Sequence, residues 1–206
     1  MKDEHSTYVL HFFKKWAPFY DVVDLFIRGI RERVFHFTDP EKEAKILDVC
    51  TGTGKQAFAF GKRGFEVIGI DLSEDMLRVA ARKNRYENVR FEIGDAKDLP
   101  YRESHFDISC ISFGLHEMPQ PLIKKVLGEM VRVTKSQGKI IIVDYASPKG
   151  KIRNFLFYHF VRLYESKYFP EFIKADLSGV IDGIGLKLRG FCEWAFGCVK
   201  IWKYEK

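Results

Sequence analysis

KILDVCTGTGKQAFAFGKRGFEVIGID, residues 45–71, is the stretch of sequence that decides the fold. It starts with an apolar run of strand length, passes through a Gly-Thr-Gly loop into a segment that suits a helix, and ends in a second apolar run. Parallel strands need a long crossover connection, usually a helix, so this order predicts a βαβ unit. Asp48 and Asp71 come at the ends of the two apolar runs, and we expect both at the same edge of a parallel sheet.

The same alternation continues toward the C-terminus. Helices are expected at 73–86, where Ser73 suits the N-cap position, and at 120–134, which starts with a proline. Further strands are expected at 88–95, 105–113, 138–146, 186–196 and 197–206. The last two form an antiparallel hairpin. The chain is therefore predicted to be an α/β protein: a doubly wound, Rossmann-like, seven-stranded and mostly parallel sheet with a C-terminal antiparallel hairpin and helices on both faces.

The segments on either side of this block are helical and rich in aromatic residues. We expect a helical cap over residues 1–40, interrupted near Pro18, and a main domain over residues 41–206 with an aromatic helical lid at about 150–178. The lid carries basic residues beside its aromatic rings, so it could contact an anionic membrane surface or an anionic substrate. The same pattern also fits a core-packed helix with a solvated basic face. The basic residues in question are Lys149, Lys151, Arg153 and Arg162.

Composition limits the class of protein. The chain has 206 residues, 46% of them hydrophobic, which is enough for one substantial core. The net charge of +6 is spread along the chain instead of being concentrated in one tail, which disfavours a nucleic acid as partner. No segment has the length or the uninterrupted apolar character of a signal peptide or a spanning helix. The four cysteines lack CxxC spacing, so we expect no metal, reduced thiols and a cytoplasmic location.

The glycine loop suggests a nucleotide-type ligand. Gly52 and Gly54 allow a tight turn and a close approach of the backbone to a ligand, and Asp71 follows at roughly the spacing of about 20 residues used to bind ribose hydroxyls. The loop also matches the dinucleotide fingerprint, so a nicotinamide cofactor is an alternative. Asp48 would repel a pyrophosphate but would attract the ammonium and sulfonium groups of S-adenosylmethionine.

Five ordered blocks carry a family resemblance. They are ILDVCTGTGKQA, VIGIDLSEDMLRVA, FEIGDAKDLPY, HFDISCISFGLHEM and EMVRVTKSQGKIIIVDYASP. Together they resemble the class I S-adenosylmethionine-dependent methyltransferases, most closely the branch that contains the ubiquinone- and menaquinone-biosynthesis enzymes. The resemblance covers residues 45–148 well and the remainder loosely.

The resemblance implies the role of each residue at the strand ends. Asp48, Gly52 and Gly54 would hold the methionine portion of S-adenosylmethionine, and Asp71 would bind its ribose. Cys50 stands where the family more often has glycine, although the quinone branch often has cysteine. The remaining implied cofactor residues are Leu72, Met76, Gly94, Asp95 and Ala96 near the adenine, and Ser112 and Phe113 near the transferred methyl group.

The sequence specifies the chemistry of the acceptor less closely. His116, in the loop after the fourth strand, is the candidate general base, and the alternative is a supporting or solvent-facing histidine. Tyr20 and Tyr145 could position the acceptor or the methionine portion, or could be core aromatics. The loop lacks the Asn-Pro-Pro-Tyr-like motif of amino-group methyltransferases.

We therefore expect a methyltransferase that acts on a small, hydrophobic or aromatic acceptor, either quinone-like or lipid-like. This interpretation also allows peripheral membrane contact. The alternatives are an oxidoreductase that binds a nicotinamide cofactor through the same glycine loop, and a non-catalytic module that only binds the cofactor.

Overall fold

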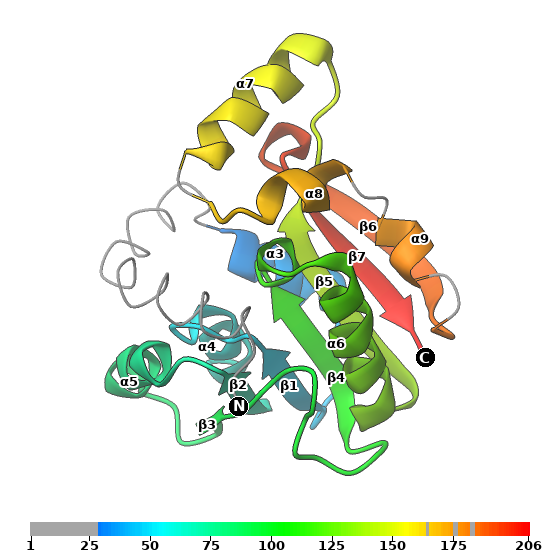
Figure 1. The fold of residues 1–206 in the computed structure, drawn as a ribbon. Helices are drawn as coiled ribbons and strands as arrows, with labels where there is room; N and C mark the ends of the chain where they lie inside the picture. The colour runs from blue at the N-terminus through cyan, green and yellow to red at the C-terminus, as the bar shows by residue number, and fades with distance from the viewer. Residues whose placement is uncertain (1–28, 164, 175–176, 182–183) are drawn as a thin grey trace.

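Seven strands form one sheet in the order β3-β2-β1-β4-β5-β7-β6 (Figure 1). The structure is a computed structural model that describes residues 29–206 except 164, 175–176 and 182–183. The strands are β1 Lys45–Val49, β2 Glu66–Asp71, β3 Val89–Ile93, β4 Phe106–Ser112, β5 Thr134–Tyr145, β6 Lys187–Trp194 and β7 Val199–Glu205.

The pairing of the strands confirms the predicted doubly wound architecture. Strands β1 to β5 run parallel, and β7 pairs antiparallel with both β5 and β6. The chain builds β2 and β3 on one side of β1 and then crosses to β4 on the other side. A doubly wound sheet binds its ligand at this reversal, outside the carboxyl ends of the strands. The fold therefore predicts a ligand site at the loops after β1, β2 and β4.

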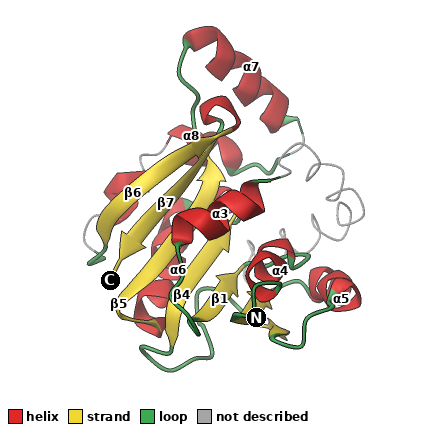
Figure 2. Ribbon diagram, turned by 180° about the vertical axis from the view of Figure 1, so that it is seen from behind, coloured by secondary structure: helices red, strands yellow, loops and turns green. Residues whose placement is uncertain are grey.

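Helices cover both faces of the sheet, as predicted. In Figure 1 the helices α6 and α9 lie in front of the sheet, and in the reversed view of Figure 2 α3 and α4 lie in front of it. The helices are α3 Ile30–Thr38, α4 Lys55–Gly61, α5 Glu74–Lys83, α6 Gln120–Val133, α7 Lys151–Arg162, α8 Phe169–Lys174 and α9 Leu177–Ile181. Two short 3-10 turns are η1 Leu115–Glu117 and η2 Ala195–Gly197. Because both faces are covered, four of the five residues of β1 are buried.

Local sequence explains where the helices start. The Ser73 side chain accepts a hydrogen bond from the backbone N–H of Met76, which confirms it as the N-cap of α5. Pro121 lies in the first turn of α6, where a missing N–H costs no helical hydrogen bond. The apolar residues of α6 recur at helical spacing and are buried against β4 and β5. They are Ile123, Val126, Leu127, Met130 and Val133.

One strand boundary differs clearly from the prediction. Strand β5 starts at Thr134 and not at residue 138, because Thr134 pairs with Phe106 and shares a 2.7 Å hydrogen bond with Ser109. In the C-terminal hairpin Cys192 lies opposite Ile201. All four cysteines are free thiols.

The predicted division of the chain at residue 40 stays a prediction, because residues 1–28 lie outside the described part. Within that part, α3 contributes Ile30 and Val34 to the core of the sheet domain. No described helix combines the length and apolar character needed to cross a bilayer.

Candidate active site

A cavity opens at the carboxyl edge of the strands, at the reversal point of the sheet. Its wall contains most of the predicted site residues, namely Asp48, Cys50, Gly52, Asp71, Leu72, Met76, Gly94, Asp95, Ala96, Ser112, Phe113 and His116. Gly54 lies between the lining residues Thr53 and Lys55 without lining the cavity itself. Tyr20 lies outside the described residues. The strand-end rule thus brings together side chains from four separate strands.

The loop after β1 has a strained backbone. Cys50, Gly52 and Gly54 all have positive φ angles, of 54°, 55° and 80°. A non-glycine residue tolerates this region poorly, which is the physical reason that glycine suits the position of Cys50. Burial raises the pKa of the Cys50 thiol well above its ordinary value, and the carboxylates of Asp71 and Asp48 raise it further. Cys50 is therefore a neutral thiol in the wall and not a nucleophile.

Asp48 is a buried carboxylate at the end of β1. Its Oδ2 accepts a 2.6 Å hydrogen bond from the Thr51 hydroxyl, whereas Oδ1 has no hydrogen-bond partner among the described residues. Burial raises the pKa of Asp48 to about 6, and the Thr51 hydrogen bond and the positive charge of Arg31 moderate the rise. A buried carboxylate with an open acceptor position favours a cationic ligand.

Asp71 ties two loops together at the end of β2. Its Oδ2 accepts the backbone N–H of Gly52, and its Oδ1 accepts the backbone N–H of Ser73, both at 2.8 Å. Burial raises the pKa of Asp71, and these backbone hydrogen bonds oppose the rise. Each oxygen keeps a second lone pair that can accept from a ligand hydroxyl.

The end of β3 lies beside the Asp71 loop. A Cβ atom on Gly94 would come within 2.5 Å of the Ile70 side chain, so the close packing of β2 and β3 requires a glycine there. Asp95 follows, with one oxygen accepting the backbone N–H of Lys97 and the other paired with the Lys97 ammonium at 3.2 Å. Leu72, Met76 and Ala96 give this end of the cavity an apolar lining.

The end of β4 carries an aromatic residue in a left-handed conformation. Phe113 has a φ of 56°, and its backbone N–H donates to the carbonyl oxygen of Val143 on β5. The guanidinium of Arg31, from α3, lies 5.3 Å from the centre of the Phe113 ring. Arg31 thereby enters the cavity wall from the N-terminal side of the sheet domain. Nothing in the sequence singles it out, because it is one of three arginines within residues 28–33.

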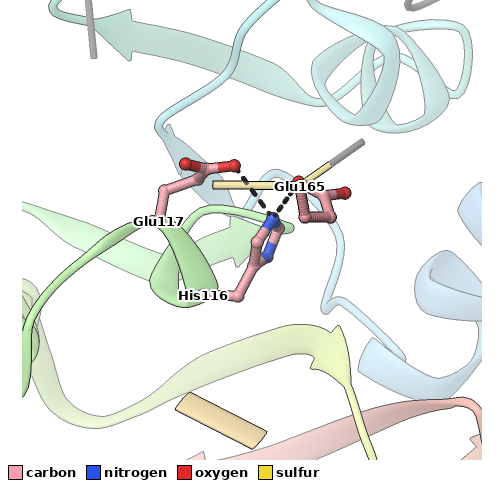
Figure 3. Close-up of side chains that lie close together, drawn as sticks. All are labelled: His116, Glu117 and Glu165. Carbon is pink, nitrogen blue, oxygen red and sulfur yellow. Dashed lines mark hydrogen bonds and ion pairs between the residues drawn. The ribbon is translucent and has the colours of Figure 1, made fainter. Parts of the chain in front are cut away.

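His116 lies at the centre of a buried cluster (Figure 3). Its Nδ1 is 2.7 Å from Asp144 Oδ1, and its Nε2 is 3.2 Å from Glu165 Oε2 and 3.3 Å from Glu117 Oε1. Asp144 also accepts the backbone N–H groups of Leu115 and Tyr145. Only 2% of the His116 side chain is exposed, which excludes the solvent-facing alternative.

The charges around His116 decide its protonation. Burial lowers the pKa of His116, but the carboxylates of Asp144 and Glu165 outweigh burial and raise it well above the ordinary value. The charged imidazole in turn helps to lower the pKa of Glu165, against the effect of burial. The carboxylates thus favour the protonated ring, and the role of general base stays a prediction that requires loss of the Nε2 proton.

Sequence reasoning did not identify Glu117, Glu165 or Asp144. Glu165 comes from the segment after α7, and the Tyr145 hydroxyl donates to its Oε1 at 2.7 Å. No described aromatic residue of α7 or α8 lines the cavity. Phe157, Tyr158 and Phe169 pack around Tyr145 or one another instead. A carboxylate in a run of aromatic and basic residues gives no sequence signal, because only the fold brings it to His116.

The glycine loop yields a prediction about stability. A Cβ atom on Gly54 would lie 2.6 Å from Phe91, and its φ of +80° disfavours any L side chain. Gly54→Ala is therefore expected to lower the free energy of unfolding by about 2–3 kcal/mol, from backbone strain together with steric overlap. Urea denaturation of the ligand-free protein measures this loss.

Gly64→Ala is the matched control, because Gly64 has a φ of +87° and no atom within 4 Å of the added Cβ. It should cost about 1 kcal/mol, from the backbone alone. Equal losses for the two variants would show that the contact with Phe91 is unimportant.

Known proteins resemble the chain in sequence. Residues 46–138 match a family model described as a methyltransferase domain. A demethylmenaquinone methyltransferase of Lactobacillus johnsonii is 34% identical over 193 residues, which cover 88% of this chain and 74% of that protein. A protein of the same name from Paenarthrobacter aurescens is 38% identical over 137 residues, covering 64% of this chain and 53% of that protein. The chain thus spans only about half of the length of this second relative.

Solved structures share the fold. A SAM-dependent methyltransferase from Aquifex aeolicus has a TM-score of 0.67 at 19% identity and covers 85% of this chain and 88% of its own. A SAM-dependent methyltransferase from Methanosarcina mazei has a TM-score of 0.66 at 18% identity, with 84% and 96% coverage. These structural similarities concern the fold alone. The Lactobacillus relative, in contrast, is 34% identical in sequence over 88% of this chain and 74% of its own length. Because this identity extends over most of both chains, the chain belongs to the S-adenosylmethionine-dependent methyltransferases.

Proposed function

We propose that this protein transfers the methyl group of S-adenosylmethionine to a small, hydrophobic, quinone-like aromatic acceptor. The observation that carries the proposal is the joint placement of Asp48, Asp71 and Asp95 on one cavity at the carboxyl ends of three neighbouring strands. The names of the relatives, demethylmenaquinone methyltransferase, support the choice of acceptor class.

The cavity suits the proposed cofactor in the charge and polarity of its wall. Asp48 presents a buried oxygen with no described hydrogen-bond partner, which suits the ammonium of the methionine portion. Asp71 holds its two oxygens fixed by backbone N–H groups, which suits two ribose hydroxyls. Leu72 and Met76 offer an apolar surface for a flat base, beside the half-buried carboxylate of Asp95.

The residues of the chain act by positioning the reactants. When bound, the cofactor supplies an activated methyl group on a sulfonium, so the protein has to supply geometry. Asp71 fixes the glycine loop and the start of α5 together, which orients the wall of the cavity before any ligand enters. An acceptor held at a near-attack distance of about 3–3.5 Å gains most of the acceleration from this orientation.

The acceptor end of the cavity is lined by apolar residues and by the charged His116 cluster. Phe113, Tyr145, Met118, Leu122 and Val126 line it. The His116 cluster stands at the same wall and offers groups that can hold or accept a proton released by the acceptor. A flat apolar molecule with polar oxygens matches this combination.

The outer surface of α7 favours a lipid-soluble acceptor. Its apolar side chains are 62–79% exposed and recur at helical spacing, at Ile152, Phe155, Leu156 and Phe160. Exposed basic residues accompany them, at Lys149, Lys151, Arg153 and Arg162. An exposed apolar stripe with flanking cations fits an anionic membrane surface, from which a hydrophobic acceptor could enter. With its four free thiols, the protein would act on the cytoplasmic side.

A labelled-methyl assay tests the acceptor. The protein is incubated with methyl-labelled S-adenosylmethionine and a short-chain demethylmenaquinol in vesicles that contain anionic lipid. We expect label in the quinol, none when the already methylated menaquinol replaces it, and none in histamine, a hydrophilic amine. Label in histamine without label in the quinol would reject the proposed acceptor class.

Thermal-shift measurements with two cofactors identify the cofactor independently of the acceptor. S-Adenosylhomocysteine should raise the melting temperature, and NADH should not, because only a ligand of the folded state stabilises it. A shift with NADH alone would restore the oxidoreductase alternative. A shift with S-adenosylhomocysteine but no methyl transfer to any acceptor would favour the non-catalytic module.

A further inference from the structure

Three side chains with metal-binding atoms converge at the acceptor end of the cavity. His116 and Glu117 come from η1, and Glu165 comes from the segment after α7 (Figure 3). One ligand atom from each lies within 4.8 Å of the other two. All three residues line the cavity, so a bound ion would have positions open to the ligand space.

The two sides of the imidazole make different contacts. Nδ1 lies 2.7 Å from Asp144, the length of a strong charge-assisted hydrogen bond. Nε2 lies 3.2 Å from Glu165 and 3.3 Å from Glu117, which is longer than such a bond prefers. Ligands at about 2.0–2.1 Å from one metal ion lie about 2.9 Å apart in an octahedron and about 3.3 Å apart in a tetrahedron. The Nε2 distances therefore match the spacing of ligands around one ion.

The surroundings have the outer shell of a metal site. A ligating histidine usually donates its other ring N–H to a carboxylate, which fixes the ring and its tautomer. Asp144 is the carboxylate that accepts from Nδ1 of His116. The backbone N–H groups of Leu115 and Tyr145 donate to Asp144 and hold it in place. The Tyr145 hydroxyl orients Glu165 by donating to its Oε1, so that Oε2 faces His116.

The charge balance favours a cation. Asp144, Glu117 and Glu165 bring three carboxylates to one imidazole, and each of these side chains is at most 7% exposed. When His116 gives up its Nε2 proton to bind a metal ion, these carboxyl groups leave an excess of negative charge, which is costly in a buried site unless a cation compensates it.

We propose that His116 Nε2, Glu117 and Glu165 bind one divalent first-row metal ion, such as Mn²⁺ or Zn²⁺, at the acceptor end of the cavity. One imidazole with two carboxylates suits these ions better than Mg²⁺, which prefers oxygen ligands and retains its waters. The ion would fasten the segment after α7 to the loop after β4. Its remaining positions would face the cavity, where an oxygen of the acceptor can bind.

Metal titration tests the proposal without any acceptor or methyl transfer. The protein is treated with EDTA, desalted and titrated with Mn²⁺ by electron paramagnetic resonance, and with Zn²⁺ by calorimetry. One ion per chain is expected, and a large excess of Mg²⁺ should displace it poorly. Failure of the wild-type chain to bind either ion stoichiometrically would overturn the proposal, whatever the acceptor assay gives.

Variants locate the bound ion. Glu165→Gln and Glu117→Gln keep the size of each side chain and should weaken Mn²⁺ binding by at least about tenfold. Glu171→Gln, an exposed carboxylate in α8, is the matched control and should change the affinity less than about twofold. Circular dichroism and melting in EDTA verify that each variant is folded. Unchanged binding in both folded cluster variants would place the ion elsewhere and overturn the assignment.

Discussion

Asp71→Ala is expected to weaken the binding of S-adenosylhomocysteine by about 100-fold or more. The substitution removes a carboxylate whose two oxygens hold the backbone N–H groups of Gly52 and Ser73. It also removes the acceptor that would meet the ribose. Hydrogen bonds to a charged group contribute about 1.5–3 kcal/mol each, and about 1.4 kcal/mol is a factor of ten in affinity. Calorimetric titration of the two proteins gives the ratio.

Glu74→Ala is the matched control for this experiment. Glu74 is a carboxylate three residues further along the chain, in the first turn of α5, and its side chain is 73% exposed. Its removal should leave the affinity within about twofold, because an exposed charge contributes little. If folded Asp71→Ala bound the product as tightly as wild type, the assignment of the ribose site would be wrong.

Asp48 should make the stability of the ligand-free protein depend on pH. Its pKa is raised by burial to about 6, from an ordinary value of 3.8. Between these values the folded protein binds a proton that the unfolded chain does not, so stability from this group rises as the pH falls. Going from pH 7 to pH 5 should add about 1.4 kcal/mol to the free energy of unfolding. Below its pKa of about 6 the folded protein holds a proton on Asp48 that the unfolded chain lacks, and pH 5 lies one unit below that pKa.

Asp48→Asn isolates this contribution. The variant cannot titrate at position 48, so the pH-dependent gain of wild type over variant, measured by urea denaturation at pH 7 and pH 5, reports Asp48 alone. Equal pH dependence in both proteins would show that the pKa of Asp48 is not raised.

The same group should control affinity for the cationic cofactor. Binding favours the ionised carboxylate, so wild-type affinity for S-adenosylmethionine should fall by about tenfold from pH 7 to pH 5. Asp48→Asn should bind weakly at both values. A pH-independent wild-type affinity would argue against contact between the ammonium and Asp48.

The order and type of the elements follow from the sequence because they depend on local pattern. The apolar runs at Lys45–Val49 and Glu66–Asp71 are buried on both faces, and short apolar runs alternating with helical segments are typical of parallel strands. The boundary at Thr134 was not predictable, because the strand extends there only to pair with Phe106 of β4. A cross-strand partner that is distant in sequence decided that residue.

The sequence by itself determined the cofactor side of the cavity, including Asp48, Asp71 and Asp95. Each of these residues lies at or just beyond the carboxyl end of a strand, and parallel strands bring those ends to one edge of the sheet. On the acceptor side, only the tertiary structure decided which groups surround Phe113 and His116. Arg31 enters from α3, and Glu165 and Asp144 meet His116 across 49 and 28 residues. Those contacts depend on how helices and loops pack over the sheet, and no periodicity along the chain encodes that packing.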